Sequence, residues 1–93
     1  MRRQRSELAN FLRTQRIKKG LSQKRVAAAL GYSSAQYVSN IERGVCSVPI
    51  KALRKMCILY GIKREHLIAV MLIDARARLE NVLNSKSVRK VKR

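Results

Sequence analysis

Apolar residues recur at helical spacing near the start of the chain, between residues that begin and end helices. Ser6 is suited to an N-cap, and the apolar stripe that follows it contains Leu8, Phe11 and Leu12. Two lysines and then Gly20 close the stretch, as is typical of a helix C-terminus. The pattern predicts a first helix that starts after Ser6 and ends just before Gly20.

A second, shorter helix is predicted over residues 23–30, between Ser22 as N-cap and Gly31 as stop. Its sequence, QKRVAAAL, contains three consecutive alanines at 27–29. Such small side chains let another helix approach closely, so we expect a packing partner there.

A turn over residues 32–34 leads into a third helix, predicted over 34–43. Val38 and Ile41 lie three residues apart and give this helix one apolar face, and Gly44 ends it. A helix, a short turn and a second, amphipathic helix form a helix-turn-helix pattern.

Two further helices are predicted in the second half of the chain. Pro49 suits position N1 of a helix that ends at Gly61, with an apolar stripe at Ile50, Leu53, Cys57 and Tyr60. A longer helix is predicted over 66–84, since this stretch contains no Gly or Pro. We expect its first half to close the core through Leu67, Val70 and Met71. Its second half is expected to expose an apolar strip, which consists of Ile73, Leu79, Val82 and Leu83.

Helices account for all of this patterning, and the fold class is therefore predicted to be all-α, a compact domain of five helices. The chain of 93 residues suits one domain, over 6–84, between a basic N-terminal arm, 1–5, and a basic tail, 85–93, that we expect to be disordered.

Charge narrows the class of partner. The chain has 22 Lys and Arg against 5 Asp and Glu, a net charge of +17, and it keeps +9 when the eight basic residues of its two ends are set aside. Such a balance favours a polyanionic partner, because Lys and Arg that bind phosphates release condensed counterions. Nucleic acid is the expected partner.

Other classes find little support in the sequence. Cys46 and Cys57 lack metal-ligand spacing and are expected to be reduced thiols, and the single His66 cannot complete a zinc site. No pair of acids, activated nucleophile or phosphate-cradling Gly loop indicates an enzyme, and we expect no metal and no cofactor. The sequence has no stretch typical of a membrane span or a secretory leader, so a cytoplasmic protein without membrane association is expected.

Four pieces of the sequence, LRTQRIKKGLSQ, VAAALG, YVSNIERG and LRKMCILYGI, occur in an order and spacing that resemble the lambda-repressor and Cro-like (XRE-type) helix-turn-helix DNA-binding family. The resemblance covers about residues 8–62. It implies a five-helix domain whose third helix enters the major groove of DNA, and transcriptional control as the role. The turn is about one residue longer than in the shortest family members, which shifts the base-reading register by up to one position.

The resemblance assigns base reading to the third helix, on the face opposite Val38 and Ile41, at Ser34, Ala35, Gln36 and Asn40. Gln and Asn are suited to this role because their amides form two hydrogen bonds with adenine. Gln36 is the strongest candidate. Ala35 offers a methyl group for thymine or is simply a helix former.

Phosphate contacts are expected from the rims of this surface, at Gln23, Lys24, Ser33, Tyr37, Ser39 and Arg43. Three of these have a second interpretation. Gln23 either touches a phosphate, braces the recognition helix or merely starts its own helix, Tyr37 either reaches a phosphate or rests on the core, and Arg43 is otherwise a solvated charge.

The resemblance also pairs Glu42 with Arg16, an ion pair that joins the first helix to the end of the third. Glu42 is the only acid between Glu7 and Glu65. A free surface carboxylate is the alternative.

The function expected from these observations is sequence-specific binding of double-stranded DNA by a transcription regulator, a repressor of bacterial or phage type that is associated with the nucleoid. A homodimer through the helix at 66–84 is expected; the alternative is that this helix folds back onto the first. Two other functions remain open: an antitoxin-type autoregulator with a protein partner, and a non-specific nucleic-acid binder.

Overall fold

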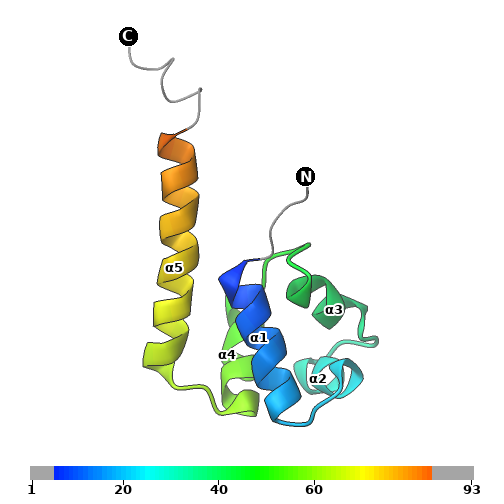
Figure 1. The fold of residues 1–93 in the computed structure, drawn as a ribbon. Helices are drawn as coiled ribbons and strands as arrows, with labels where there is room; N and C mark the ends of the chain where they lie inside the picture. The colour runs from blue at the N-terminus through cyan, green and yellow to red at the C-terminus, as the bar shows by residue number, and fades with distance from the viewer. Residues whose placement is uncertain (1–5, 85–93) are drawn as a thin grey trace.

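The computed structural model describes residues 6–84, so the predicted basic arm and tail lie outside the described residues. It contains five helices and, within 6–84, no strand, which confirms the all-α, five-helix fold class (Figure 1). The helices are α1 (Glu7–Lys18), α2 (Gln23–Leu30), α3 (Gln36–Glu42), α4 (Ile50–Tyr60) and α5 (Arg64–Leu83).

The first two helices begin and end at the residues that their sequences predict. The Ser6 hydroxyl accepts a hydrogen bond from the N–H of Ala9, and the Ser22 hydroxyl accepts one from Arg25, both at 3.0 Å. Gly31 ends α2 in the left-handed conformation, φ 90°, which only glycine adopts without strain. Local capping thus fixes the lengths of both helices.

The third and fourth helices start later than their sequences predict. α3 begins at Gln36 rather than at 34, and its N-cap residue, Ala35, has no side-chain oxygen for a capping bond; the Ser34 hydroxyl accepts from Gln36 N at 3.3 Å instead. Pro49 is the N-cap of α4 rather than its N1 residue, because its extended backbone (ψ 151°) delays the helix to Ile50. The prediction that Ile50 belongs to the buried stripe is therefore wrong: its side chain is 65% exposed.

The core lies between α1, α2, α3 and α4. Leu12 of α1, Val26 of α2, Val38 of α3 and Met56 of α4 each have no exposed surface. In the first short helix of the helix-turn-helix, Ala27 is buried while Ala28 and Ala29 are exposed, so one alanine of the three makes the close contact. The other buried apolar residues are Ala9, Leu30, Ile41, Ala52, Leu53 and Tyr60.

Helix α5 lies beside α1 and extends beyond the rest of the domain (Figure 1). Leu67 and Met71, near its start, pack against the core as predicted, and the rings of His66 and Phe11 lie 4.7 Å apart. None of its residues is fully buried. Among residues 6–84 no helix is long and apolar enough to cross a membrane.

Candidate nucleic-acid interface

Helix α3 is held in the domain by one face and exposes the other. Val38 and Ile41 are buried in the core. Gln36 and Arg43 are exposed and Asn40 is half-buried, and the spacing of these three residues, i, i+4 and i+7, places them on one face. Two candidate base readers and one candidate phosphate contact therefore form a single row on α3.

These three side chains are joined by hydrogen bonds. Asn40 Oδ1 accepts from Gln36 Nε2 at 3.0 Å and from Arg43 Nη2 at 2.6 Å. These two hydrogen bonds give the row defined side-chain orientations.

The structure places the remaining candidate base readers outside the helix. Ser34 lies in the turn before α3 and is exposed, whereas Ala35 is the half-buried N-cap residue. Among the candidate phosphate contacts, Ser33 is exposed in the same turn and Ser39 is half-buried on α3. Of these residues, Ser34 is linked to the row through its hydroxyl, which accepts from the backbone N–H of Gln36 at 3.3 Å.

Tyr37 is the candidate phosphate contact nearest the core. Its side chain is half-buried against the core, and its ring lies 4.5 Å from that of Tyr32, with the two planes tilted by 55°. Burial, with a smaller effect of Tyr32, raises the pKa of Tyr37 above its usual value. The aromatic pair connects the turn between α2 and α3 to α3 itself.

The C-terminal end of α3 is held in the domain by a buried carboxylate, that of Glu42. The Glu42 side chain is only 1% exposed and lies against Arg16 of α1, whose Nε and Nη2 donate to the two carboxylate oxygens at 2.7 and 3.0 Å. Arg16 Nη1 also donates to the carbonyl of Leu21, at 2.8 Å. This two-bond contact holds Glu42 in a fixed orientation. The hydrogen bond to Glu42 raises the pKa of Arg16, against the opposing effect of burial.

Gln23, the first residue of α2, completes this anchor. Its Nε2 donates to Glu42 Oε1 at 3.0 Å. Of its three interpretations, the structure shows the brace, and a contact with phosphate stays a prediction. The Glu42 carboxylate thus joins α1, α2 and α3, and it fixes the orientation of α3 relative to the other two helices.

Comparison with known proteins identifies the class of this arrangement. The sequence profile of the helix-turn-helix domain matches residues 7–69, more than half of the chain. The chain belongs to the helix-turn-helix domain family. The predicted resemblance to lambda-repressor and Cro-like proteins is thereby confirmed at the level of this family.

One solved structure and the curated proteins complete the comparison. The chain is similar to the clp gene regulator ClgR of Corynebacterium glutamicum, with 28% sequence identity and a TM-score of 0.61. The similarity covers 84% of this chain and 87% of that one. None of the curated proteins matches the chain.

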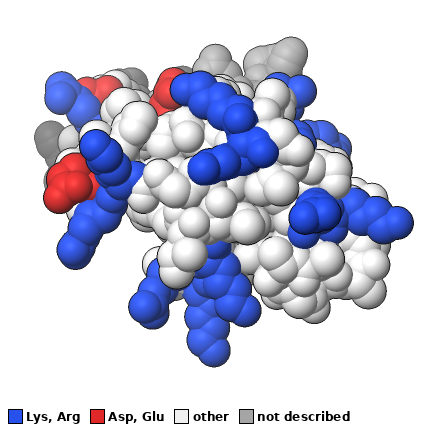
Figure 2. Space-filling view, turned by 90° about the horizontal axis from the view of Figure 1, so that it is seen from below, with Lys and Arg blue, Asp and Glu red and all other residues white. Residues whose placement is uncertain are grey.

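Basic side chains surround the end of the helix-turn-helix domain at which α2 and the α4–α5 loop lie. Figure 2 shows Lys and Arg projecting on all sides of this face, while the visible acidic side chains lie toward one side. Lys24 and Arg25, on the first turn of α2, are both exposed. Lys24 is thus free of the core, as a phosphate contact requires.

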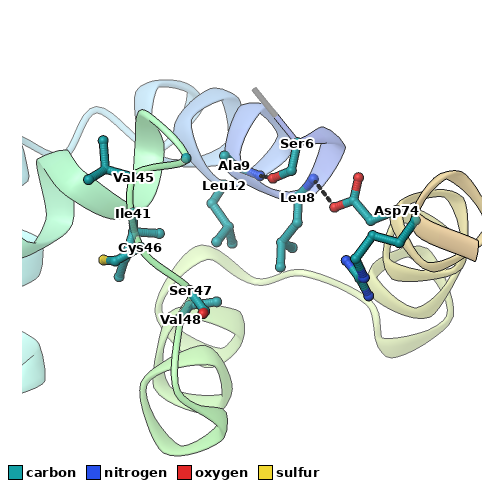
Figure 3. A pocket seen from close by; sticks show the side chains of 12 residues that line it. Ser6, Leu8, Ala9, Leu12, Ile41, Val45, Cys46, Ser47, Val48 and Asp74 are labelled. Carbon is teal, nitrogen blue, oxygen red and sulfur yellow. Dashed lines mark hydrogen bonds between the residues drawn. The ribbon is translucent and has the colours of Figure 1, made fainter. Parts of the chain in front are cut away.

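Two residues that the sequence did not single out have structural roles, Asp74 and Tyr60. Asp74 of α5 accepts from the backbone N–H groups of Glu7 and Leu8, at 2.8 and 3.0 Å, and so adds a second cap to α1 (Figure 3). A single Asp after seven mostly apolar residues is the signal that was available. A carboxylate also suits the positive end of the α1 dipole.

Tyr60 is the second missed residue. Its hydroxyl is buried and has no hydrogen-bond partner within residues 6–84. Burial raises its pKa well above the usual value, and the negative charge of Glu42 adds to the effect. Tyr60 is thus a neutral neighbour of the Arg16–Glu42 pair, and its position in a stripe gave no sign of this.

An open pocket of about 400 Å³ lies where α1 begins, between the loop that follows α3 and the middle of α5 (Figure 3). Leu8, Leu12, Ile41 and Val48 supply apolar walls, and Asp74 supplies a charged edge. Asp74 already accepts two backbone hydrogen bonds from α1, so the charged edge of the pocket is part of the contact between α1 and α5.

Proposed function

We propose that this protein is a sequence-specific, double-stranded DNA-binding transcription regulator that reads the major groove with α3. The observation that carries the proposal is the row formed by Gln36, Asn40 and Arg43 on one face of α3. The opposite face of this helix packs on the core, and its C-terminal end is held by Glu42. Membership of the helix-turn-helix family supports DNA as the ligand. Similarity to a protein described as a gene regulator supports transcriptional control.

Base reading and phosphate binding are divided between two sets of residues in this proposal. Gln36 and Asn40 contact base edges, with Ser34 and Ala35 at the entrance of α3. Lys24, Ser33, Tyr37, Ser39 and Arg43 contact phosphates, which fixes the register of the protein on DNA without selecting sequence. Gln23 acts mainly through Glu42, which it contacts directly.

The regulator acts as a repressor and as a homodimer in our proposal. The predicted strip members on α5 are exposed, but Ile73 lies about 100° from Leu72 around the helix and is not part of the seam that we propose. The seam consists of Ile68, Leu72, Ala75 and Leu79, which are separated by four, three and four residues, the spacing of a coiled coil. The three large side chains among them are 49%, 62% and 62% exposed. A second copy would cover such a seam, whereas water solvates it poorly. Two copies would then present two α3 helices to two half-sites of one operator.

In-vitro selection from random duplex DNA tests the proposal. The wild-type protein and Gln36→Ala are selected in parallel at about 150 mM salt, where non-specific binding is weakened. We expect an enriched motif with two-fold symmetry, in which Gln36→Ala loses the preference at one base pair of each half-site. Tight binding without any enriched motif would show that charge alone carries the interaction.

The cellular setting follows from the same proposal. A repressor that occupies operators belongs with the chromosome, and we place this protein in the cytoplasm of a bacterium or of a cell infected by phage. The alternative of an antitoxin-type regulator uses the same α5 seam for a different protein. Purification of the native protein distinguishes them. A complex of two copies of this chain supports the homodimer, and a stable complex with a different protein supports the antitoxin.

A further inference from the structure

The hydrogen bonds on α3 determine which atoms Asn40 and Gln36 can offer to a base. Arg has N–H donors and no acceptor, so the Asn40 atom that lies 2.6 Å from Arg43 Nη2 must be the oxygen. The same oxygen faces the Gln36 amide at 3.0 Å, so the Gln36 atom there must be the nitrogen. One arginine thus fixes the orientation of two amides, which are otherwise free to turn over.

The consequence for Asn40 is a loss of acceptor capacity. A carbonyl oxygen has two lone pairs, and Asn40 Oδ1 uses both, one toward Arg43 and one toward Gln36. The two-bond contact of Asn with adenine needs that oxygen as an acceptor and is therefore blocked. What remains to Asn40 is its Nδ2 group, a donor.

Gln36 keeps both of its functions. One N–H of Nε2 is directed to Asn40, which leaves the second N–H and the carbonyl oxygen Oε1 for a base. Gln36 is accordingly able to form the two-bond contact with adenine that Asn40 cannot. The two amides, although alike in chemistry, differ in what they read.

We propose that Arg43 is a specificity-positioning residue: it makes Asn40 a donor-only reader that rejects cytosine, whose major-groove edge presents only a donor, and leaves the two-bond contact with adenine to Gln36. This inference rests on the proposed function, since it concerns the bases that α3 selects. It adds to the phosphate contact of Arg43, because Arg43 has further N–H groups beside the one that Asn40 uses.

The test compares base preference with overall affinity. Binding is measured for a set of four duplexes that differ only at the base pair whose preference Asn40→Ala abolishes in selection. The wild type should disfavour cytosine relative to guanine, thymine and adenine, all of which offer an acceptor, by about 2- to 10-fold, the effect of one neutral hydrogen bond. Arg43→Met should reduce this ratio to near one, because the freed Asn40 amide can turn over and accept as well as donate.

Three variants separate positioning from charge. Arg43→Lys keeps a donor toward Asn40 Oδ1 and should retain the base ratio. Asn40→Asp keeps the acceptor and replaces the outward donor by a second acceptor, so it should shift the preference toward cytosine. Arg54→Met removes an exposed charge from α4 and should leave the ratio unchanged while circular dichroism confirms the fold of every variant.

The outcomes also distinguish this inference from the proposed function. If Arg43→Met weakens binding to all four duplexes by the same factor, Arg43 is a phosphate contact only, and the inference is wrong while sequence-specific binding stands. If Asn40→Ala changes no position, the inference is equally wrong. If the wild type itself does not distinguish duplexes, the proposed function fails, and the inference fails with it.

Discussion

Helices α4 and α5 follow one another across a short connection, yet the protein uses them differently. α4 buries four residues, Ala52, Leu53, Met56 and Tyr60, and closes the core beneath α1 and α2. α5 is nearly twice as long and buries none. It contacts the domain through Asp74, the ring of His66 and the partly buried Leu67 and Met71.

The difference separates the part of the protein that provides stability from the helix that we propose for self-association. The body formed by α1 to α4 contains all of the buried apolar residues within 6–84, and its buried carboxylate, that of Glu42, is paired with Arg16. The outer half of α5 has apolar residues that nothing within 6–84 buries, as at Leu79 and Leu83. Mutations in the body should therefore change folding, and mutations in outer α5 should change self-association.

Breaking the Arg16–Glu42 pair should have the largest effect. Arg16→Met leaves the Glu42 carboxylate buried with Gln23 as its remaining partner, and should lower the free energy of unfolding by about 3 to 5 kcal/mol. Denaturant unfolding of Arg16→Met, Glu42→Leu and the double variant checks this. We expect the double variant to lose clearly less than the sum of the single losses, and strictly additive losses would contradict the coupling.

Truncation of a core leucine should come next. Leu12→Ala removes a side chain without exposed surface and should cost about 2 to 5 kcal/mol. The matched control is Leu72→Ala on α5, 62% exposed, which should change the stability of the dilute protein by about 0.5 kcal/mol or less. Equal losses at the two sites would show that α5 belongs to the same cooperative core.

Removal of the α5 cap on α1 should have an intermediate effect. Asp74→Ala withdraws two hydrogen bonds from the α1 N-terminus and should cost about 0.5 to 2 kcal/mol. Hydrogen exchange should become faster in α5 and in the first turn of α1, and remain unchanged in α3. Glu80→Ala, which removes an exposed pair with Arg76, is the control and should alter neither.

Substitution in the α5 seam should have the smallest effect on folding. Leu79→Ser should leave the unfolding of the dilute protein within about 0.5 kcal/mol of wild type and weaken the dimer in sedimentation equilibrium. Ile73→Ser, similarly exposed but about 100° away from Leu72 around the helix, tests the choice of face. A wild-type protein that remains monomeric at tens of micromolar, or an Ile73 variant as disruptive as that of Leu79, would contradict the seam.

Much of the fold could be predicted because its signals are local. Ser6 and Ser22 cap the helices that they precede, and Gly31 and Gly61 end α2 and α4 in the left-handed conformation. The first residues of α3 and α4 were harder to predict, because Ser34 and Pro49 can each occupy more than one position at the beginning of a helix. Ile50 was wrongly assigned to the buried stripe because, from the sequence, Leu53 could share a helix face with either Met56 or Cys57. Only the packing shows that Met56 is the buried residue.

The candidate site could be predicted in its members but not in its connections. Helical spacing places Gln36, Asn40 and Arg43 on one face of α3, and the family resemblance supplies their proposed roles and the contact of Glu42 with Arg16. The bond from Gln23 to Glu42 and the cap from Asp74 depend on where separate helices meet in space. No periodicity in the sequence encodes these contacts.

The most direct test of the central claim compares specific with non-specific binding as salt rises. Affinities for a selected duplex and for an unrelated duplex of equal length are measured between about 50 and 200 mM salt, a range over which phosphate contacts weaken strongly. If α3 reads bases, both affinities should fall while the selected duplex remains preferred by about a thousandfold or more. Equal affinities at every salt concentration would contradict the account, because charge alone would then explain the binding.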